Sequence, residues 1–133
     1  MTRPLSRLEY RKHITRAMLR AEPDTLFVFG DNMAARGLGG QAKEMRGEHN
    51  AVGIPTKRHP RMDDAAFLTD ADLDAVRPIA QAAYRRLADH LKAGGTVVFP
   101  ADGIGTGLAQ LQERAPAVDE YLGRCYEHLK GMA

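Results

Sequence analysis

The 133-residue sequence has little of what usually indicates a secreted, membrane-bound or disulfide-rich protein. Its single cysteine, Cys125, excludes an intrachain disulfide and favours a reducing compartment. No apolar run approaches the roughly 20 residues that span a membrane, and the first residues lack the apolar segment of a secretory signal. We therefore expect a cytoplasmic protein with no membrane partner.

Charge and aromatic content also limit the partners that we expect. The 19 basic residues nearly balance the 17 acidic ones, which permits an anionic ligand but not a nucleic-acid-binding surface dense in positive charge. There is no tryptophan for stacking on exposed bases. The histidines show no metal-ligand spacing, so we predict neither a metal nor a cofactor, and the sequence argues against nucleic acid.

Strand-like and helix-like segments alternate along the chain, in a pattern typical of one α/β domain over residues 1–133. The alternation predicts a mostly parallel sheet with helices on both faces. Residues 1–23 are expected to form a helical N-terminal extension, with the helix over 6–21. Strands are predicted at 25–29, 50–54 and 96–99, and further helices at 42–47 and 70–93 and near the C-terminus.

The two longest helices are predicted from their apolar stripes. In segment 70–93 we expect Pro78 to divide a short lead-in from the main helix. The expected buried stripes are Ile79, Ala83, Leu87 and Leu91 in this helix, and Val118, Leu122, Cys125 and Leu129 in the last one. The position of Cys125 in the second stripe predicts a core residue rather than a nucleophile.

Three loops follow the predicted strands, and two of them are rich in glycine. They read GDNMAARGLGGQ, PTKRHP and PADGIGTGLAQ. Ligands of α/β proteins bind at the carboxyl ends of the strands, and glycine lets the backbone approach a phosphate closely. The sequence matches neither the Walker loop nor the dinucleotide fingerprint. The glycines therefore indicate either a ligand site or, more simply, tight turns with no role in binding.

The stretches FPADGIGTGLAQL and VFGDNMAARGLGGQAKEM resemble the two ligand-binding loops of macrodomains. The resemblance runs with gaps from Leu26 to Leu122, and the chain is also similar to short macro-like proteins of bacteria and phages. It implies a three-layer α/β/α fold that lacks peripheral strands. It further implies that the two loops bind the diphosphate and distal ribose of ADP-ribose or a related nucleotide, either free or on an ADP-ribosylated macromolecule.

The resemblance also implies which residues contact the ligand. The amide of Asn32 suits the vicinal hydroxyls of a ribose, and Gln41 is a second polar candidate, although both could instead hydrogen-bond within the loop. The full set of predicted contacts is Asp31, Asn32, Gly39, Gly40, Gln41, Thr56, Asp102, Gly103, Ile104, Gly105, Thr106, Gly107 and Leu108.

Within that family the chain most resembles the branch of terminal ADP-ribose glycohydrolases. The residues that carry this resemblance are Pro55-Thr56-Lys57 and the G-L-x-x-L-Q stretch. In that branch a lysine forms an adduct with the ribose and an aspartate assists. Lys57 matches the lysine, but Ala109 replaces the aspartate and cannot move a proton. Asp31 is an alternative catalytic carboxylate, unless it only caps its loop through an Asx turn, and Asp102 is another.

We therefore expect the protein to bind an ADP-ribose-type ligand. Weak hydrolysis of ADP-ribosyl bonds is a second activity that the sequence leaves open. The alternative from another class is an RNA-binding or protein-interaction module that keeps the fold without the pocket chemistry.

Overall fold

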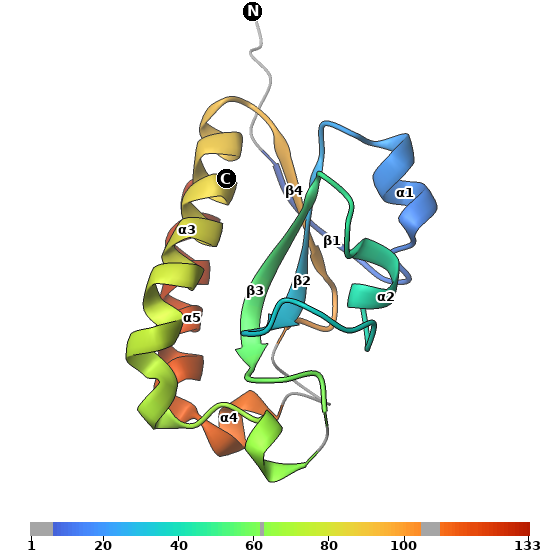
Figure 1. Cartoon of the computed structure of the whole chain (residues 1–133). Helices are drawn as coiled ribbons and strands as arrows, with labels where there is room; N and C mark the ends of the chain where they lie inside the picture. Colours follow the sequence, from blue (N-terminus) through green and yellow to red (C-terminus); the bar gives the residue numbers. More distant parts are fainter. Residues whose placement is uncertain (1–6, 62, 105–109) are drawn as a thin grey trace, which may run out of the picture.

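Four parallel strands form one sheet in the order β1-β4-β2-β3 (Figure 1). The computed structural model describes residues 7–61, 63–104 and 110–133. The strands are β1 (Arg7–Arg11), β2 (Leu26–Asn32), β3 (Ala51–Lys57) and β4 (Thr96–Pro100). The helices are α1 (Arg16–Ala21), α2 (Ala42–Met45), α3 (Leu73–Lys92), α4 (Leu111–Arg114) and α5 (Pro116–Lys130), with 3₁₀ turns at Asp64–Ala66 and Asp70–Asp72.

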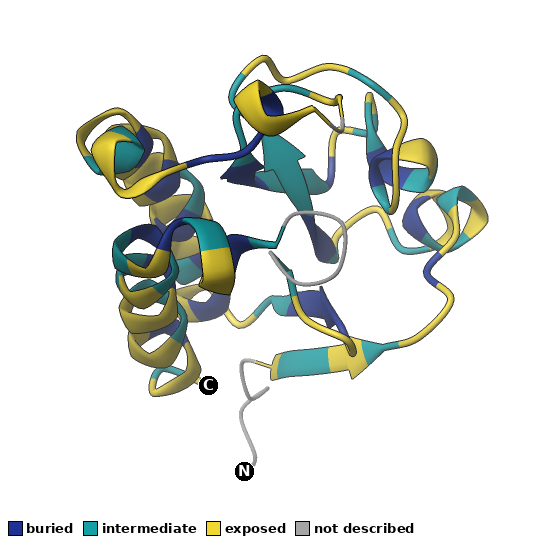
Figure 2. Ribbon diagram, turned by 90° about the horizontal axis from the view of Figure 1, so that it is seen from below, coloured by how far each residue is buried: buried dark blue, intermediate teal, exposed yellow. Residues whose placement is uncertain are grey.

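Helices cover both faces of this sheet, as expected for an α/β fold. Helices α1 and α2 lie on one face, and α3 and α5 lie side by side on the other (Figures 1 and 2). The connections β1–β2 and β2–β3 advance across the sheet in one direction, whereas β3–β4 returns. Because such crossovers are right-handed, a reversal of direction places the intervening helix on the opposite face. The predicted three-layer α/β arrangement is confirmed.

The strand side chains alternate between two apolar cores, which explains why the strands read as continuous apolar runs. On β2, Leu26 and Val28 pack in the core beneath α3 and α5, and Phe27 and Phe29 pack in the core beneath α1 and α2. All four are buried. Figure 2 shows the same distribution, with buried residues on the strands and exposed residues along the outer helix faces. A strand covered on both faces needs apolar residues at every position.

The predicted helix over residues 6–21 is wrong in its first half. Residues Arg7–Arg11 form β1, which pairs in parallel with β4, so the segment adds a strand to the sheet and is not a helical extension. The helix α1 begins only after Thr15, whose hydroxyl accepts a hydrogen bond from the Met18 amide. Strand β1 lies at the sheet edge, where Arg7 and Tyr10 are exposed and its other residues are only half-buried, so its few apolar residues did not identify it.

Helix α3 also corrects the prediction, because Pro78 lies inside it without dividing it. Pro78 falls in the second turn, where its ring costs one helical hydrogen bond to the Asp74 carbonyl. The buried stripe is Val76, Ala80, Tyr84, Leu87 and Leu91, and Ile79 is 43% exposed. The stripe was therefore placed correctly only in its second half.

Helix α5 follows its predicted stripe closely. Val118, Leu122 and Leu129 are buried against α3 and the sheet, and Cys125 is half-buried at the edge of the same core. Within the described part of the chain, no helix combines the length and the apolar character that crossing a membrane requires.

Candidate functional site

A cleft of about 440 Å³ opens at the carboxyl ends of β2 and β4. These strands are neighbours, but the chain leaves β2 toward α2 on one face and leaves β4 toward α5 on the other. Such a divergence leaves a crevice between the two connections, which is where open α/β sheets bind ligands. The walls come from the end of β2, the glycine-containing loop that follows it, the end of β3, and residues 100, 103 and 104.

Most of the predicted contact residues that the structure describes line this cleft. They are Asp31, Asn32, Gly39, Gly40, Gln41, Thr56, Gly103 and Ile104, and the candidate catalytic residue Lys57 lines the cleft with them. Asp102 instead lines a second hollow of about 410 Å³, which shares Pro100, Gly103 and Ile104 with the first. Gly105, Thr106, Gly107, Leu108 and Ala109 lie outside the described residues.

Asp31 makes a partly buried ion pair with Arg46, a residue that the sequence did not single out. The guanidinium donates hydrogen bonds of 2.5 and 3.2 Å to the two carboxylate oxygens. The backbone N–H of Asn32 donates a third hydrogen bond of 2.8 Å to the same carboxylate. Both side chains are less than a quarter exposed. Both oxygens of this carboxylate are engaged by the Arg46 guanidinium, which favours a positioning role for Asp31 over a catalytic one.

Arg46 also fixes the glycine-containing loop that forms one wall of the cleft. Its Nε donates to the Gly37 carbonyl at 2.7 Å and its Nη2 donates to the Arg36 carbonyl at 3.2 Å. Gly37 has a φ of +94°, and a Cβ there would lie 2.6 Å from the Pro60 Cβ. Only glycine therefore lets this loop contact the loop after β3. The Arg46 guanidinium therefore connects the end of β2, the end of α2 and the loop between them, and we call this set of contacts the Arg46 frame.

Two amide oxygens of residues that line the cleft have no hydrogen-bond donor among the described residues. The Asn32 Nδ2 group donates to the Arg36 carbonyl at 2.7 Å, but Asn32 Oδ1 and Gln41 Oε1 are buried without a partner among the described residues. A buried acceptor without a donor costs about 1–3 kcal/mol, and a bound ligand or water is one explanation for such an atom. Asn50 Oδ1 is in the same state outside the cleft lining, so the two oxygens support a ligand here only together with the charge of the cleft. Asn32 and Gln41 were both predicted contacts.

Thr56 is placed by an irregularity where β2 and β3 end. Asp31 is opposite Pro55 and Asn32 is opposite Lys57, so Thr56 is an extra residue on β3. Its side chain is buried, and its hydroxyl donates to the Asp31 carbonyl at 3.2 Å. This bulge holds the two strand ends together at the cleft.

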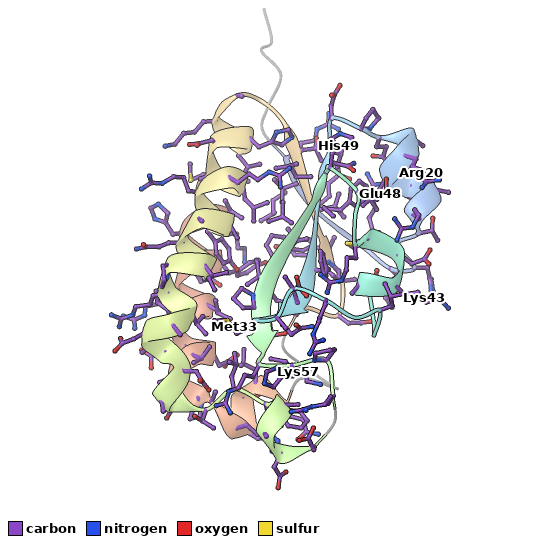
Figure 3. All side chains as sticks on the ribbon, in the orientation of Figure 1. Arg20, Met33, Lys43, Glu48, His49 and Lys57 are labelled. Atoms are coloured by element: carbon purple, nitrogen blue, oxygen red, sulfur yellow. The ribbon has the colours of Figure 1, made fainter. Side chains whose placement is uncertain are left out.

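Lys57 lies at the end of β3 beside Met33, which follows β2 (Figure 3). Burial lowers the pKa of Lys57, and the nearby Asp63 carboxylate opposes part of that effect. The ammonium donates to the Arg61 carbonyl and lies 4.8 Å from the centre of the Phe67 ring. Arg58 and Arg61, which the sequence offered as neighbouring cations, instead pair with Asp72 and Asp63. A lowered pKa increases the fraction of neutral amine, the form that acts as a nucleophile.

The cleft carries an excess of positive charge. Arg36, Arg46 and Lys57 line it against the single carboxylate of Asp31, among the residues described there. At Gly39 and Gly40 a Cβ would meet no atom within 4 Å, so the glycines leave the rim open. This combination of open glycine backbone and positive charge suits an anionic ligand.

Gly53 provides a test of the Asp31 position. A Cβ on Gly53 would lie 2.8 Å from Asp31 Oδ2 and 3.0 Å from Asp31 Cβ. Because Arg46 holds that carboxylate, Gly53→Ala should lower the free energy of unfolding by about 1–3 kcal/mol. Gly123→Ala in helix α5 is the matched control: a Cβ there meets nothing within 4 Å, so we expect a gain of about 0.5–1 kcal/mol. Urea unfolding measures both, and equal effects would show that Asp31 is free to move.

The structure thus defines the protein as an α/β domain with a positively charged cleft at the carboxyl ends of its strands. The chain belongs to a family of unknown function, DUF7831, whose model matches residues 9–125. No curated protein and no solved structure matches the chain. The macrodomain resemblance therefore stays a prediction from the sequence.

Proposed function

We propose that the chain binds a nucleotide diphosphate of the ADP-ribose type in the cleft at the ends of β2 and β4. The observation that carries the proposal is the pair of buried acceptors, Asn32 Oδ1 and Gln41 Oε1, at a cleft with excess positive charge. Hydroxyl groups of a ribose supply the donors that these oxygens lack, and phosphates match the charge. A ligand that has both groups meets both requirements.

The second hollow supports a nucleoside at the other end of this ligand. Four aromatic residues line it, namely Tyr10, Tyr84, Phe99 and Tyr126. The Tyr10 and Tyr126 hydroxyls hydrogen-bond to each other, and Tyr126 packs edge-on to Phe99 with ring centres 5.3 Å apart. Aromatic walls suit a flat base. Because the two hollows share residues 100, 103 and 104, one extended ligand can occupy both.

A thermal-shift series tests this proposal with ADP-ribose, AMP, ribose 5-phosphate and a short RNA. A ligand that binds only the folded protein stabilises it by RT ln(1 + [L]/Kd), about 2.7 kcal/mol at a hundredfold excess over Kd. We expect ADP-ribose to raise Tm more than AMP or ribose 5-phosphate at equal concentration, because each of these fills one hollow. A larger shift with RNA would support the nucleic-acid alternative instead.

A further inference from the structure

A basic groove of about 950 Å³ lies between α3 and α5 and is lined only by residues of these two helices. Half-buried and buried side chains form its floor: Tyr84, Ala88, Tyr121 and Cys125. Exposed cations form its walls, with Arg77, Arg85 and Lys92 on α3 and Arg124 on α5. An apolar floor with a charged rim is the anatomy of a protein interface.

Most cations of this groove have no carboxylate partner within the described part of the chain. Arg85 and Lys92 have no carboxylate partner there, Arg77 contacts only the Tyr121 ring, and Arg124 has a 3.5 Å pair with Glu120. Asp89 is the one acidic residue of the groove. Seven arginines outside the groove are paired with carboxylates: Arg11, Arg16, Arg20, Arg46, Arg58, Arg61 and Arg114. Arg7, Arg36 and Arg86 have no such pair among the described residues, and none of these three lines the groove.

We propose that this groove binds an acidic amphipathic helix of a partner protein. Carboxylates on the partner would complete the ion pairs that Arg77, Arg85 and Lys92 lack, and an apolar ridge would cover the floor. Arg77 and Lys92 are 15 residues apart on α3, which is about 22 Å and matches a partner helix of about four turns.

Nucleic acid fits this groove less well. Tyr84 is buried, and the Arg77 guanidinium lies over the Tyr121 ring at 5.6 Å from its centre. The groove therefore lacks the open ring faces on which single-stranded bases stack. The observations favour carboxylates on a folded helix over phosphates on a flexible strand.

The test uses three fluorescent probes with the full chain at low salt. The first is an amphipathic peptide of about 18 residues with leucine on one helix face and glutamate on the other. The second is a peptide with the same residues in scrambled order. The third is an oligothymidylate of equal charge. We expect the amphipathic peptide to bind more tightly than either of the other probes in fluorescence anisotropy. Equal binding of the scrambled peptide, tighter binding of the oligothymidylate, or no binding of the amphipathic peptide would overturn the proposal.

Charge-reversed variants locate the binding. The double variant Arg85→Glu/Lys92→Glu should bind the amphipathic peptide at least about tenfold more weakly than the wild type does. The matched control is Lys12→Glu with Lys43→Glu, two exposed lysines outside the groove, of which Lys43 lies on α2 across the sheet (Figure 3). It should change affinity little. An equal loss in both pairs would contradict binding in the groove. If the first pair fails to fold, Arg85→Gln with Lys92→Gln gives the same comparison without added negative charge.

Discussion

Arg46→Ala is expected to abolish ADP-ribose binding and to lower the free energy of unfolding by about 2 kcal/mol. The substitution leaves the partly buried Asp31 carboxylate without its cation, which costs about 3–5 kcal/mol when a pair is fully buried and less here. It also frees the Arg36 and Gly37 carbonyls, so the loop beside Asn32 loses its fixed position. Urea unfolding and calorimetric titration measure the two effects.

Arg86→Ala is the matched control for this prediction. Arg86 also donates to backbone carbonyls, those of His49 and Ala51, but it does not line the cleft. We expect a loss below about 1 kcal/mol, because these bonds are exposed, and unchanged affinity. An Arg46→Ala protein that binds ADP-ribose like the wild type would show that the Arg46 frame is not needed for the site.

Ala109→Asp is expected to raise release of ADP-ribose from an ester-linked peptide by about 10²–10⁴-fold, the usual contribution of a positioned acid–base group. The wild type should be slow, because the resemblance puts alanine where related enzymes have the carboxylate. The neutral amine of Lys57, favoured by its lowered pKa, would attack the anomeric carbon, form a carbon–nitrogen bond and displace the peptide carboxylate, while the new aspartate takes up the amine proton. Water would then attack the same carbon, break the carbon–nitrogen bond and release free ADP-ribose with the lysine regenerated.

Lys57→Ala in the Ala109→Asp background should remove this gain. Product release is followed by chromatography of free ADP-ribose, with tight binding confirmed separately for each variant. A wild type that already hydrolyses rapidly and tolerates Lys57→Ala would assign the chemistry to other groups and leave Lys57 as a phosphate contact.

The central strands and the cleft could be predicted because their signals are local in the sequence. The runs around Phe27 and Val98 are buried on both faces, and the glycines after Phe29 follow directly from the strand that positions them. Asn32 and Gln41 were found because a strand end and a glycine cluster predict where the following polar residues lie.

Arg46, β1 and the intact helix at Pro78 could not be found in this way. The role of Arg46 depends on Asp31, 15 residues earlier, and on two carbonyls whose positions only the folded loop defines. Strand β1 pairs with β4, about 90 residues later, and nothing local distinguishes it from a helix. At Pro78 the packing of Val76 and Ala80 outweighs the loss of one hydrogen bond.

Calorimetric titration of ADP-ribose into the wild type, Gly39→Ala and Gly39→Glu tests the central claim most directly. Gly39 lines the cleft, has no φ in the left-handed region, and has open space where a Cβ would stand, so both substitutions should fold normally. We expect the wild type and Gly39→Ala to bind alike. Gly39→Glu should weaken binding by at least about tenfold, because its carboxylate faces the phosphates. No binding to the wild type at millimolar ADP-ribose, or unchanged affinity in Gly39→Glu, would contradict a diphosphate site in this cleft.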